Sequence, residues 1–437
     1  MMPPAPILAC LNRLEDAGYQ CWCVGGCVRD WRLGRMPHDY DLCTDATPEE
    51  MKAIFRQYDL VLAGQKHGTV GVITPEGVVE ITTFRTESGY RDNRHPDQVA
   101  FVTSVEEDLA RRDFTINAMA WNPHKGLCDP FGGQEDLQKG ILRSVGDPET
   151  RFQEDSLRIL RGVRFAVRFH LQPEEKTLQA MISLSHLMDN LARERIFEEL
   201  CKLITLAKGE DLLLYQPILT AAIPELRPCV GFDQHNRHHI YDVYTHIAHV
   251  TAAMPQHLAL RWAALLHDAG KPECFTMDEQ GQGHFYGHAK VSAQIADSVL
   301  SRLKAPTALR QQVVELVKLH MTPIEPEKKT VRRWLSRLGE EMFDLLLTLQ
   351  EGDMGRKGTD RPEEMDQFFR LRQLKQEIMA ENACLRVNDL AVNGHDLMAL
   401  GIRGKDIGLT LNHLLEQVLD ETLPNEKDAL LQSLKEQ

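Results

Sequence analysis

Three acidic side chains near the start of the chain have the spacing of a metal-dependent phosphoryl-transfer centre. Asp39 and Asp41 are two residues apart in a segment with strand character, so they would project from one face of a strand. Glu80 lies between apolar neighbours in a second strand-like run and could supply a third carboxylate. Carboxylate oxygens suit Mg²⁺, and two such ions would activate an attacking 3′-hydroxyl and stabilise a leaving pyrophosphate. The alternatives are a solvated turn for the two aspartates and an exposed strand face for Glu80.

Two adjacent glycines precede these acids and predict a close approach of the backbone to a phosphate. Gly25 and Gly26 follow a short expected strand and open an expected helix, where the absence of side chains admits an anion. Arg29 could add a charge-assisted contact to the same phosphate. A tight turn without any ligand fits the two glycines equally well.

Two later segments carry arginines beside residues that can be buried. Residues 111–119, RRDFTINAM, suit the binding of a ribose and a triphosphate. Residues 154–166, EDSLRILRGVRFA, predict a single helix on which Asp155 and Arg158 are neighbours. A hydrogen-bond acceptor beside a donor can match the Watson–Crick edge of a base. The other interpretation of this pair is a surface salt bridge, which would contribute little to stability.

Histidines and aspartates recur in the second half of the chain. His267 and Asp268 are adjacent in an apolar helical segment, where an unpaired carboxylate would be costly to bury. Imidazole and carboxylate groups together are good ligands for divalent transition metals, although ligand type alone does not identify the metal. Further members of this set lie on both sides of the pair, at His246, His288, His320 and Asp353. His249, one helical turn after His246, is an alternative to it.

The elements that must position these residues change in character along the chain. Short β-branched runs predict strands at 21–24, 39–43, 68–73 and 78–84. Apolar residues at helical spacing predict helices at 6–17, 47–55, 157–169, 174–183 and 193–204. Strand signals nearly vanish after about residue 146. We therefore expect an α+β fold, with a head that contains the sheet and a long helical body after it.

Composition and charge exclude several classes of protein. No apolar run approaches the ~18 residues that span a bilayer, and no secretory signal is recognisable, so we expect a cytoplasmic protein without a membrane partner. The ten cysteines are then expected as reduced thiols, and Cys21, Cys23 and Cys27 lack the spacing of a zinc site. A net charge of −14 argues against non-specific coating of RNA but leaves a local basic surface open.

The first half of the chain resembles the class II tRNA nucleotidyltransferases, the bacterial and eukaryotic-type CCA-adding enzymes. The matching segments occur in family order between residues 24 and 200: VGGCVRD, the Asp39-Tyr40-Asp41 pair, RRDFTINAM, DPFGGQEDL, EDSLRILRGVRFA and ARERIFEEL. This resemblance implies a small polymerase β-type head with a mixed sheet, followed by a helical neck, body and tail. It also implies transfer of C, C and A from CTP and ATP to the 3′ end of tRNA.

The resemblance further implies which residues would bind the metal ions and the nucleotide. Asp39 and Asp41 would hold the catalytic magnesium ions. Gly26, Arg29 and Arg112 would contact the incoming nucleotide.

Base recognition and the switch from C to A addition are implied in the same way. Asp155 and Arg158 would read the base of CTP or ATP, and Arg161 and Arg164 would support the same pocket. Residues 84–98, FRTESGYRDNRHPDQ, match the family's flexible loop, and their polar composition with glycine and proline is typical of a mobile segment.

A second resemblance, to the HD phosphohydrolase superfamily, covers about residues 235–356 and includes the segment LLHDAGKP. It implies His246, His267, Asp268 and Asp353 as the primary metal ligands. His288 and His320 match positions where superfamily members with fuller sites have further ligands. A water activated by the metal would attack a phosphate ester.

These observations predict four domains: a nucleotidyltransferase head at 1–145, a helical neck and body at 146–230, an HD domain at 231–356 and a helical tail at 357–437. The tail would hold the tRNA, with Arg403 and Lys405 able to meet phosphate. A poly(A) polymerase or an enzyme that adds only the terminal A would share this head. A protein of another class, an HD phosphohydrolase with an RNA-binding head, is less consistent with Asp39 and Asp41, because binding alone does not need metal carboxylates. The oligomeric state is left open.

Overall fold

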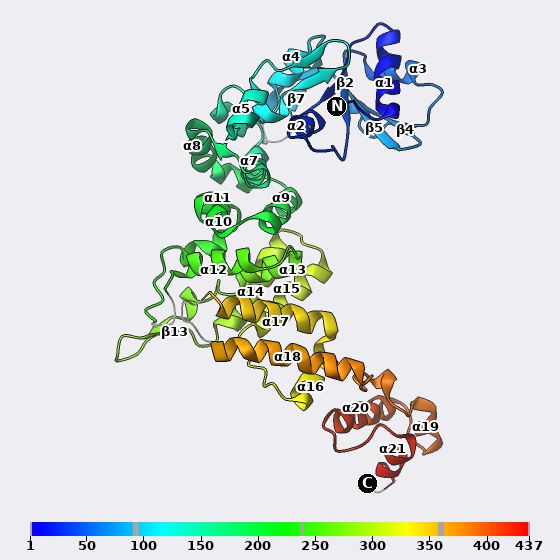
Figure 1. The fold of residues 1–437 in the computed structure, drawn as a ribbon, viewed down its shortest axis with the longest axis vertical. Helices are drawn as coiled ribbons and strands as arrows, with labels where there is room; N and C mark the ends of the chain where they lie inside the picture. Colours follow the sequence, from blue (N-terminus) through cyan, green and yellow to red (C-terminus); the bar gives the residue numbers. More distant parts are fainter. Residues whose placement is uncertain (1, 91–95, 237–239, 357–361, 436–437) are drawn as a thin grey trace. The chain divides into compact units, whose positions relative to one another are not determined.

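The computed structural model of the chain describes residues 2–90, 96–236, 240–356 and 362–435 (Figure 1). The chain forms two compact units, which are described separately. The first consists of Met1–Ala207 with Asp211–Pro224, and the second of Lys208–Glu210 with Glu225–Gln437. The division into four domains stays a prediction.

A mixed seven-stranded sheet forms the centre of the first unit, which confirms the predicted α+β fold. Its strand order is β3-β4-β5-β2-β1-β8-β9. The pairing of β2 with β5 is parallel, and the other pairings are antiparallel. The strands are β1 Cys21–Val24, β2 Asp41–Thr44, β3 Leu60–Val61, β4 Thr69–Thr74, β5 Gly77–Thr83, β8 Ala120–Asn122 and β9 Gly126–Cys128.

Helices cover this sheet and continue beyond it. The α1 and α3 helices lie side by side against the sheet (Figure 1). The helices up to the end of the first unit are α1 Ala5–Asp16, α2 Gly26–Arg32, α3 Pro48–Ile54, α4 Val105–Ala110, α5 Gly133–Lys139, α6 Pro148–Glu154, α7 Leu157–Phe169, α8 Glu175–Ser183, α9 Arg193–Leu206, α10 Gly209–Leu214 and α11 Gln216–Ala222. The predicted strands and helices correspond to β1, β2, β4, β5, α1, α3, α7, α8 and α9.

One prediction about local structure was wrong. Residues 154–166 do not form one helix, because α6 ends at Glu154 and Asp155 has an extended conformation, with φ −139° and ψ 100°, before α7 begins. Much of segment 84–98 lies in an antiparallel hairpin of β6 Arg85–Tyr90 and β7 Pro96–Phe101, and the mobility of this segment stays a prediction. Residues 91–95 of that segment lie outside the described residues.

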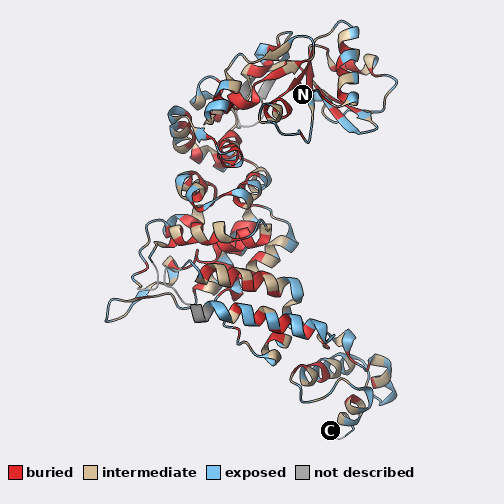
Figure 2. Ribbon diagram, viewed as in Figure 1, coloured by how far each residue is buried: buried red, intermediate tan, exposed pale blue. Residues whose placement is uncertain are grey.

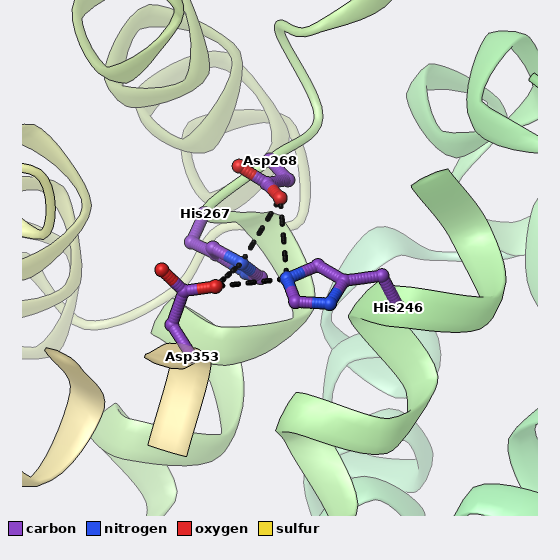
Figure 3. Close-up of side chains that lie close together, drawn as sticks. All are labelled: His246, His267, Asp268 and Asp353. Carbon is purple, nitrogen blue, oxygen red and sulfur yellow. Dashed lines mark hydrogen bonds and ion pairs between the residues drawn. The ribbon is translucent and has the colours of Figure 1, made fainter. Parts of the chain in front are cut away.

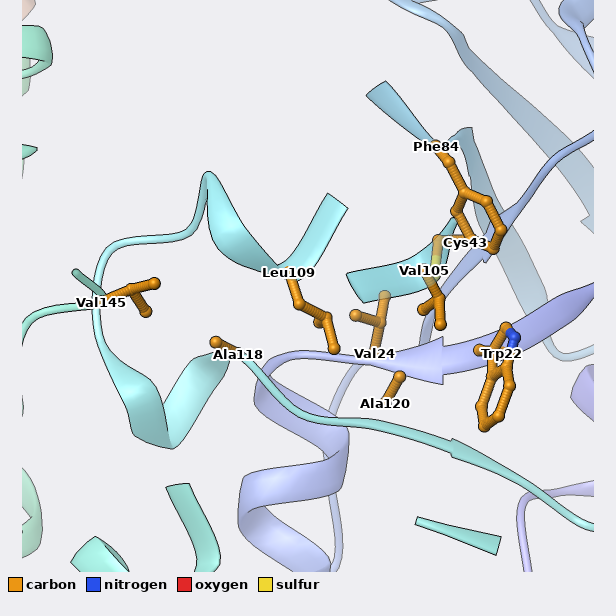
Figure 4. Packing of buried hydrophobic residues seen from close by; sticks show 9 residues of the cluster. All are labelled: Trp22, Val24, Cys43, Phe84, Val105, Leu109, Ala118, Ala120 and Val145. Carbon is orange, nitrogen blue, oxygen red and sulfur yellow. The ribbon is translucent and has the colours of Figure 1, made fainter. Parts of the chain in front are cut away.

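The core of the head lies between the sheet and α4. Trp22 and Val24 on β1, Cys43 on β2 and Leu109 on α4 meet there (Figure 4). The whole buried cluster comprises Trp22, Val24, Cys43, Phe84, Val105, Leu109, Ala118, Ala120 and Val145. Burial of this apolar surface fixes the ends of β1 and β2, from which the candidate site residues extend.

The second unit is mainly helical, as the sequence predicts. Its helices are α12 Val243–Ala253, α13 Leu258–Leu266, α14 His288–Arg302, α15 Thr307–Leu319, α16 Lys328–Leu338, α17 Glu340–Met354, α18 Pro362–Ala380, α19 Gly394–Ala399, α20 Lys405–Leu419 and α21 Lys427–Ser433. Buried residues concentrate on α12, α13 and α17, whereas the tail has a smaller core of its own (Figure 2). No helix among the described residues is long and apolar enough to cross a membrane.

Short elements that the sequence analysis did not predict complete the fold. Parallel β10 Ile141–Leu142 and β11 Gln172–Pro173 pair in the first unit, and β12 Thr276–Met277 and β13 Gly283–His284 form a hairpin in the second. The 3₁₀ turns are η1 Gln65–His67, η2 Thr115–Asn117, η3 Ser185–Asn190, η4 Pro224–Cys229, η5 Pro272–Cys274 and η6 Val387–Asp389.

Candidate active sites

The three predicted carboxylates lie together at the end of the sheet where β2 begins. Asp41 is the first residue of β2 and pairs in register with Glu80 on the parallel strand β5. Residues opposite each other on adjacent strands project from the same face, so the two carboxylates are neighbours. Asp39 lies in the loop before β2 and not on the strand, which corrects the expectation that both aspartates alternate along it. All three line one cavity of about 650 Å³.

The carboxyl group of Asp41 has a raised pKa. Surrounding protein atoms restrict its hydration at the cavity wall and raise the pKa of its carboxyl group. Arg112 lowers this pKa, while Glu80 and Asp39 raise it further. Three carboxylates that repel one another favour a divalent cation among them.

A second cavity, of about 340 Å³, shares Asp41 with the first. It contains most of the residues predicted to contact a nucleotide: Gly26, Arg29, Arg112, Asp155, Arg158 and Arg161. Six arginines line it in all, the others being Arg111 and Arg195. We call it the arginine cavity. This density of cationic donors suits a triphosphate.

The glycine pair and Arg29 form one wall of the arginine cavity. Gly25 has φ +75°, and a Cβ atom there would lie 2.9 Å from Nη1 of Arg112, so the position requires glycine. The Arg29 side chain is buried and donates from Nη1 to the Asn117 side-chain oxygen at 2.6 Å and from Nε to Asp30 at 2.9 Å. Its direction is therefore fixed before any ligand binds.

Asp155 and Arg158 both line the arginine cavity but do not pair as neighbours on one helix. Asp155 accepts a hydrogen bond from the Leu157 amide at 3.1 Å and one from Arg195 at 3.2 Å. Arg158 donates to the Glu154 carboxylate at 2.7 Å and to the Arg111 carbonyl at 3.0 Å. Different partners hold the two side chains, so the surface salt bridge considered from the sequence is not what orients them.

Arg164 does not line this cavity, and its supporting role there stays a prediction. Its Nε donates to Glu199 on α9 at 2.5 Å, and both side chains are buried. Its guanidinium also lies over the Phe165 ring, 4.2 Å from the centroid. Arg164 thus holds α7 to α9 within the neck.

The sequence analysis missed four polar residues of the cavity: Arg111, Asp113, Asn117 and Arg195. Asp113 accepts from Arg161 at 2.7 Å and from the Asn117 amide at 3.0 Å. Burial disfavours its charge, but Arg161 and Asn117 outweigh burial and lower the pKa of Asp113 to about 2. Three of the missed residues lie in RRDFTINAM and the fourth lies in ARERIFEEL. The family resemblance therefore identified the segments that contain them, but not the individual residues.

The second unit brings together all six histidines and aspartates predicted as metal ligands. His246 lies on α12, His267 and Asp268 directly follow α13, and Asp353 lies on the last turn of α17 (Figure 3). Nε2 of His246 is 2.8 Å from Asp353 Oδ1 and 3.4 Å from Asp268 Oδ2. One ligand atom from each of these four buried residues lies within 4.8 Å of the others.

Asp268 also belongs to a second set with His288 and His320. Its Oδ1 atom is 3.2 Å from Nε2 of His288 and 3.7 Å from Nε2 of His320, whereas its Oδ2 atom faces the first set. His249 belongs to neither set, since its ring lies against Tyr241 at 4.6 Å between centroids. This arrangement favours the prediction of His246 over His249.

Main-chain carbonyls fix the orientation of three imidazoles. Nδ1 of His267, His288 and His320 donates to Ala264, Phe285 and Val317 at 2.7, 2.7 and 2.6 Å. Each Nε2 atom is then directed at the cluster, as in metal ligands whose other nitrogen is held by a carbonyl. The Nε2 atoms of His288 and His320 are 3.3 Å apart, a contact that a cation between them would relieve.

Lys271 is the group at this cluster that the sequence analysis did not single out. Its Nζ lies 2.8 Å from Asp268 Oδ2 and donates to the buried Gln234 side chain at 2.8 Å.

The two aspartates of the cluster also act on His267. Burial opposes protonation of His267, but Asp268 and Asp353 raise the pKa of its imidazole to about 9. The cluster therefore attracts positive charge.

The remaining sequence features have simpler explanations. Cys21, Cys23 and Cys27 are buried at β1 and α2, and the candidate metal groups among the described residues contain no cysteine. Asn393 caps α19 by accepting from the amides of His395 and Asp396. Arg403 and Lys405 are exposed at the start of α20, where contact with tRNA stays a prediction.

Comparison with known proteins gives matches along most of the chain. Family models described as "Poly A polymerase head domain", "Probable RNA and SrmB- binding site of polymerase A" and "tRNA nucleotidyltransferase domain 2 putative" match residues 21–143, 170–228 and 275–434. The CCA-adding enzyme of Streptococcus pyogenes serotype M4 is 33% identical over 96% of this chain and 93% of that protein.

Two further similarities involve a shorter match and a solved structure. The CCA-adding enzyme of Lactobacillus helveticus is 50% identical over 193 residues, which are 44% of this chain and 48% of that protein. The crystal structure of the Bacillus stearothermophilus CCA-adding enzyme in complex with CTP superimposes with a TM-score of 0.75 at 29% identity, covering 100% of this chain and 98% of that one.

Proposed function

The chain belongs to the CCA-adding enzyme family, and from this premise we propose that its first unit adds C, C and A to the 3′ end of tRNA without a nucleic-acid template. CTP and ATP would be the nucleotide substrates, and each addition would release pyrophosphate. The observation that carries this proposal is the position of Asp41, which lines both the arginine cavity and the cavity of the three carboxylates. A triphosphate bound by the arginines would have its α-phosphate next to the carboxylates.

Enzymes of this family use a divalent metal, generally Mg²⁺, and the carboxylates of this chain fit it. Asp39, Asp41 and Glu80 offer only oxygen atoms as ligands. Restricted hydration is the main cause of the raised pKa of Asp41, and the negative charges of Glu80 and Asp39, which a cation would offset, raise it further. When bound, Mg²⁺ supplies charge stabilisation for the attacking and leaving oxygens. The protein's part is to hold the three carboxylates in fixed positions at the start of β2 and on β5.

The other residues of the arginine cavity would bind and orient the nucleotide. Arg29 and Arg112 would contact the phosphates, and Gly25 and Gly26 would let the backbone approach them. Asp155 would accept hydrogen bonds from a base and Arg158 would donate them. Arg195 and Glu154, which already hold these two side chains, would keep the donor and acceptor in place. Arg161, held by Asp113, would support the same pocket.

A tRNA extension assay tests the proposal and separates it from its alternatives. Transcripts that end before the CCA, after C and after CC would be incubated with Mg²⁺ and with CTP or ATP supplied separately. Addition of C to the first two and of A only to the third supports the proposal. Extension of the CC-ended transcript alone would identify an A-adding enzyme, and long A tails would identify a poly(A) polymerase. If no transcript were extended, the remaining interpretation would be a phosphohydrolase with an RNA-binding head.

We propose a second activity, metal-dependent hydrolysis of a phosphate ester, for the His-Asp cluster of the second unit. The supporting observation is that six imidazole and carboxylate ligands converge in two overlapping sets, with three imidazoles already oriented by carbonyls. His246, His267, Asp268 and Asp353 would hold one divalent transition metal, and His288 and His320 would add ligands through the shared Asp268. A bound metal supplies Lewis-acid activation of water and phosphate.

Metal binding and hydrolysis can be tested separately from nucleotide addition. Metal-free protein would be titrated with Ni²⁺, Mn²⁺, Co²⁺ and Zn²⁺ by calorimetry and then assayed with p-nitrophenyl phosphate and 2′,3′-cyclic AMP. Binding that is lost in Asp268→Asn, together with hydrolysis that depends on the metal, supports the proposal. Binding without hydrolysis of either ester would make the cluster a structural metal site.

A further inference from the structure

A cavity of about 180 Å³ lies beside the His-Asp cluster, within the second unit. Asp353 from the first ligand set and His320 from the second both line it. Two glutamines, Gln350 and Gln367, supply amide groups to the same wall, and we call it the glutamine cavity. A molecule that occupies this cavity therefore lies against a ligand of each candidate metal position.

The rest of the wall is mainly apolar and has no lysine or arginine among the described residues. Its apolar members are Met321, Pro323, Ile324, Met354, Phe368 and Leu371. The volume is smaller than the ~300–1,000 Å³ of a site that encloses a whole ligand, so the cavity suits one part of a ligand. A flat ring fits such a wall, whereas a second phosphate group would have no cation there to balance its charge.

Main-chain carbonyls fix the orientation of both glutamine side chains. Nε2 of Gln350 donates to the carbonyls of Thr322 and Leu319 at 2.8 and 3.3 Å. Nε2 of Gln367 donates to the carbonyl of Ile324 at 2.7 Å. A carbonyl oxygen only accepts, so neither amide can turn over without losing these bonds. Both Oε1 atoms are left as acceptors that are accessible and have no donor among the described residues.

We propose that the glutamine cavity binds the base of a nucleoside phosphate ester and selects adenine and cytosine, which have an exocyclic amino group, over uracil. This inference rests on the hydrolysis proposed above for the His-Asp cluster. In that reaction the oxygen of water bonds to phosphorus and the bond from phosphorus to a ribose oxygen breaks. The ribose oxygen takes a proton from the water. The base takes no part in these bond changes, so the cavity determines which ester is positioned for them.

The selection follows from the two open acceptors, which lie on neighbouring helices, Gln350 on α17 and Gln367 on α18. An amino group has two N–H donors, one for the oxygen of each glutamine. Uracil has a carbonyl oxygen where cytosine has its amino group, so the glutamine oxygens would face an acceptor and stay unpaired. The apolar side chains contact the face of any base and do not discriminate.

Methyl NMR of methionine tests base binding without metal or hydrolysis. Full-length protein with carbon-13 in its methionine methyl groups would be titrated with adenosine and, separately, with uridine. The signals of Met321 and Met354, assigned from Met321→Leu and Met354→Leu, report on the glutamine cavity and not on the arginine cavity, whose lining contains neither. The proposal predicts that both signals shift with adenosine, at a Kd roughly tenfold below that for uridine. Equal Kd values, or no shift of either signal, would overturn it.

A substitution at Gln367 tests the source of the selection. Gln367→Leu removes the amide and keeps an apolar side chain of similar length, so the Kd for adenosine should rise roughly tenfold, to the value for uridine. Gln350 is left intact, because it holds two main-chain carbonyls. Gln376→Leu, exposed on the same helix and outside the cavity, is the matched control and should retain the parent Kd values. An unchanged preference for adenosine in Gln367→Leu would contradict the assignment.

Hydrolysis rates distinguish a failure of this inference from a failure of the proposed activity. With the metal that binds in calorimetry, the parent should have a kcat/KM roughly tenfold higher for 2′,3′-cyclic AMP than for 2′,3′-cyclic UMP. Gln367→Leu should bring the ratio close to one, whereas Gln376→Leu should keep it. Equal kcat/KM values in the parent would contradict the inference. Nucleoside binding at Met321 and Met354 without hydrolysis of either ester would contradict the proposed activity and support the assignment of the cavity to a base.

Discussion

Asp41 and Glu80 are register partners across the one parallel pairing of the described head sheet, between β2 and β5. They are 39 positions apart in the chain, and the pairing places both carboxylates on one face beside Asp39. Asp41 alone of the three also lines the arginine cavity. The proposed catalytic centre thus depends on the order of strands in this sheet as much as on the acids themselves.

The two proposed activities should be separable by single isosteric substitutions. Asp41→Asn should lower the rate of nucleotide addition by more than about 100-fold. Loss of a residue that only hydrogen-bonds to a metal ligand lowers activity about 10- to 100-fold, and loss of a direct ligand should lower it further. The Asp41→Asn variant should leave hydrolysis of p-nitrophenyl phosphate unchanged. Asp268→Asn should do the reverse. If either folded variant lost both activities, the assignment of one activity to each unit would be wrong.

Arg158 should affect the choice of base more than the binding of the triphosphate. In Arg158→Ala, the ratio of kcat/KM for CTP on tRNA lacking CCA to that for ATP on CC-ended tRNA should change by roughly 5- to 150-fold, the equivalent of about 1–3 kcal/mol for a base contact. Arg111→Ala, from the same cavity, is the matched control and should lower both values together. An unaltered ratio in Arg158→Ala would show that the base is read elsewhere.

Arg164 should matter for stability and not for nucleotide binding. Arg164→Ala removes the nearer partner of the buried Glu199 and leaves only Lys202, 3.8 Å away, so the free energy of unfolding in urea should fall by roughly 3 kcal/mol. Lys139→Ala, which breaks an exposed pair with Glu135, should leave the free energy of unfolding nearly unchanged. A stable Arg164→Ala protein with a raised KM for CTP would restore the nucleotide-binding role implied by the family resemblance.

Asp113 should make stability depend on pH in the acid range. Its pKa is about 2 in the folded protein against an ordinary value of 3.8, so its contribution is present above pH 3.8 and is lost as the pH falls through 2. The wild type should exceed Asp113→Asn by about 2 kcal/mol at pH 6, and the difference should shrink to roughly half by pH 3. Urea unfolding at both pH values measures it. A difference that stays constant would assign the effect of Asp113 to packing.

The sequence predicted local elements well where periodicity and composition agree. β1 at Cys21–Val24 and α7 at Leu157–Phe169 have the expected bounds. The break at Asp155 could not be predicted, because the apolar periodicity from Phe152 to Leu160 continues through it. At the break Asp155 accepts hydrogen bonds from the Leu157 amide and from Arg195, 40 residues away. The contact with Arg195 has no local signal.

For the candidate sites, too, some features could be predicted from the sequence and others only from the structure. The six members of the His-Asp cluster could be selected because their residue types are costly to bury alone. Their convergence depends on five separate helices and was visible only in the structure. Arg164 looked equivalent to Arg161 by its spacing, yet Glu199 directs it into the neck while Asp113 directs Arg161 to the cavity. Residue type predicted chemistry, and tertiary partners decided which side chains take part.

Sequencing the 3′ ends made from tRNA that lacks CCA, with CTP, ATP and Mg²⁺ present together, tests the central claim most directly. A single protein-templated site should produce ends that read CCA and should then stop, with no product from Asp41→Asn. Ends that carry only A, runs of A beyond the third position, or addition that persists in Asp41→Asn would contradict the account.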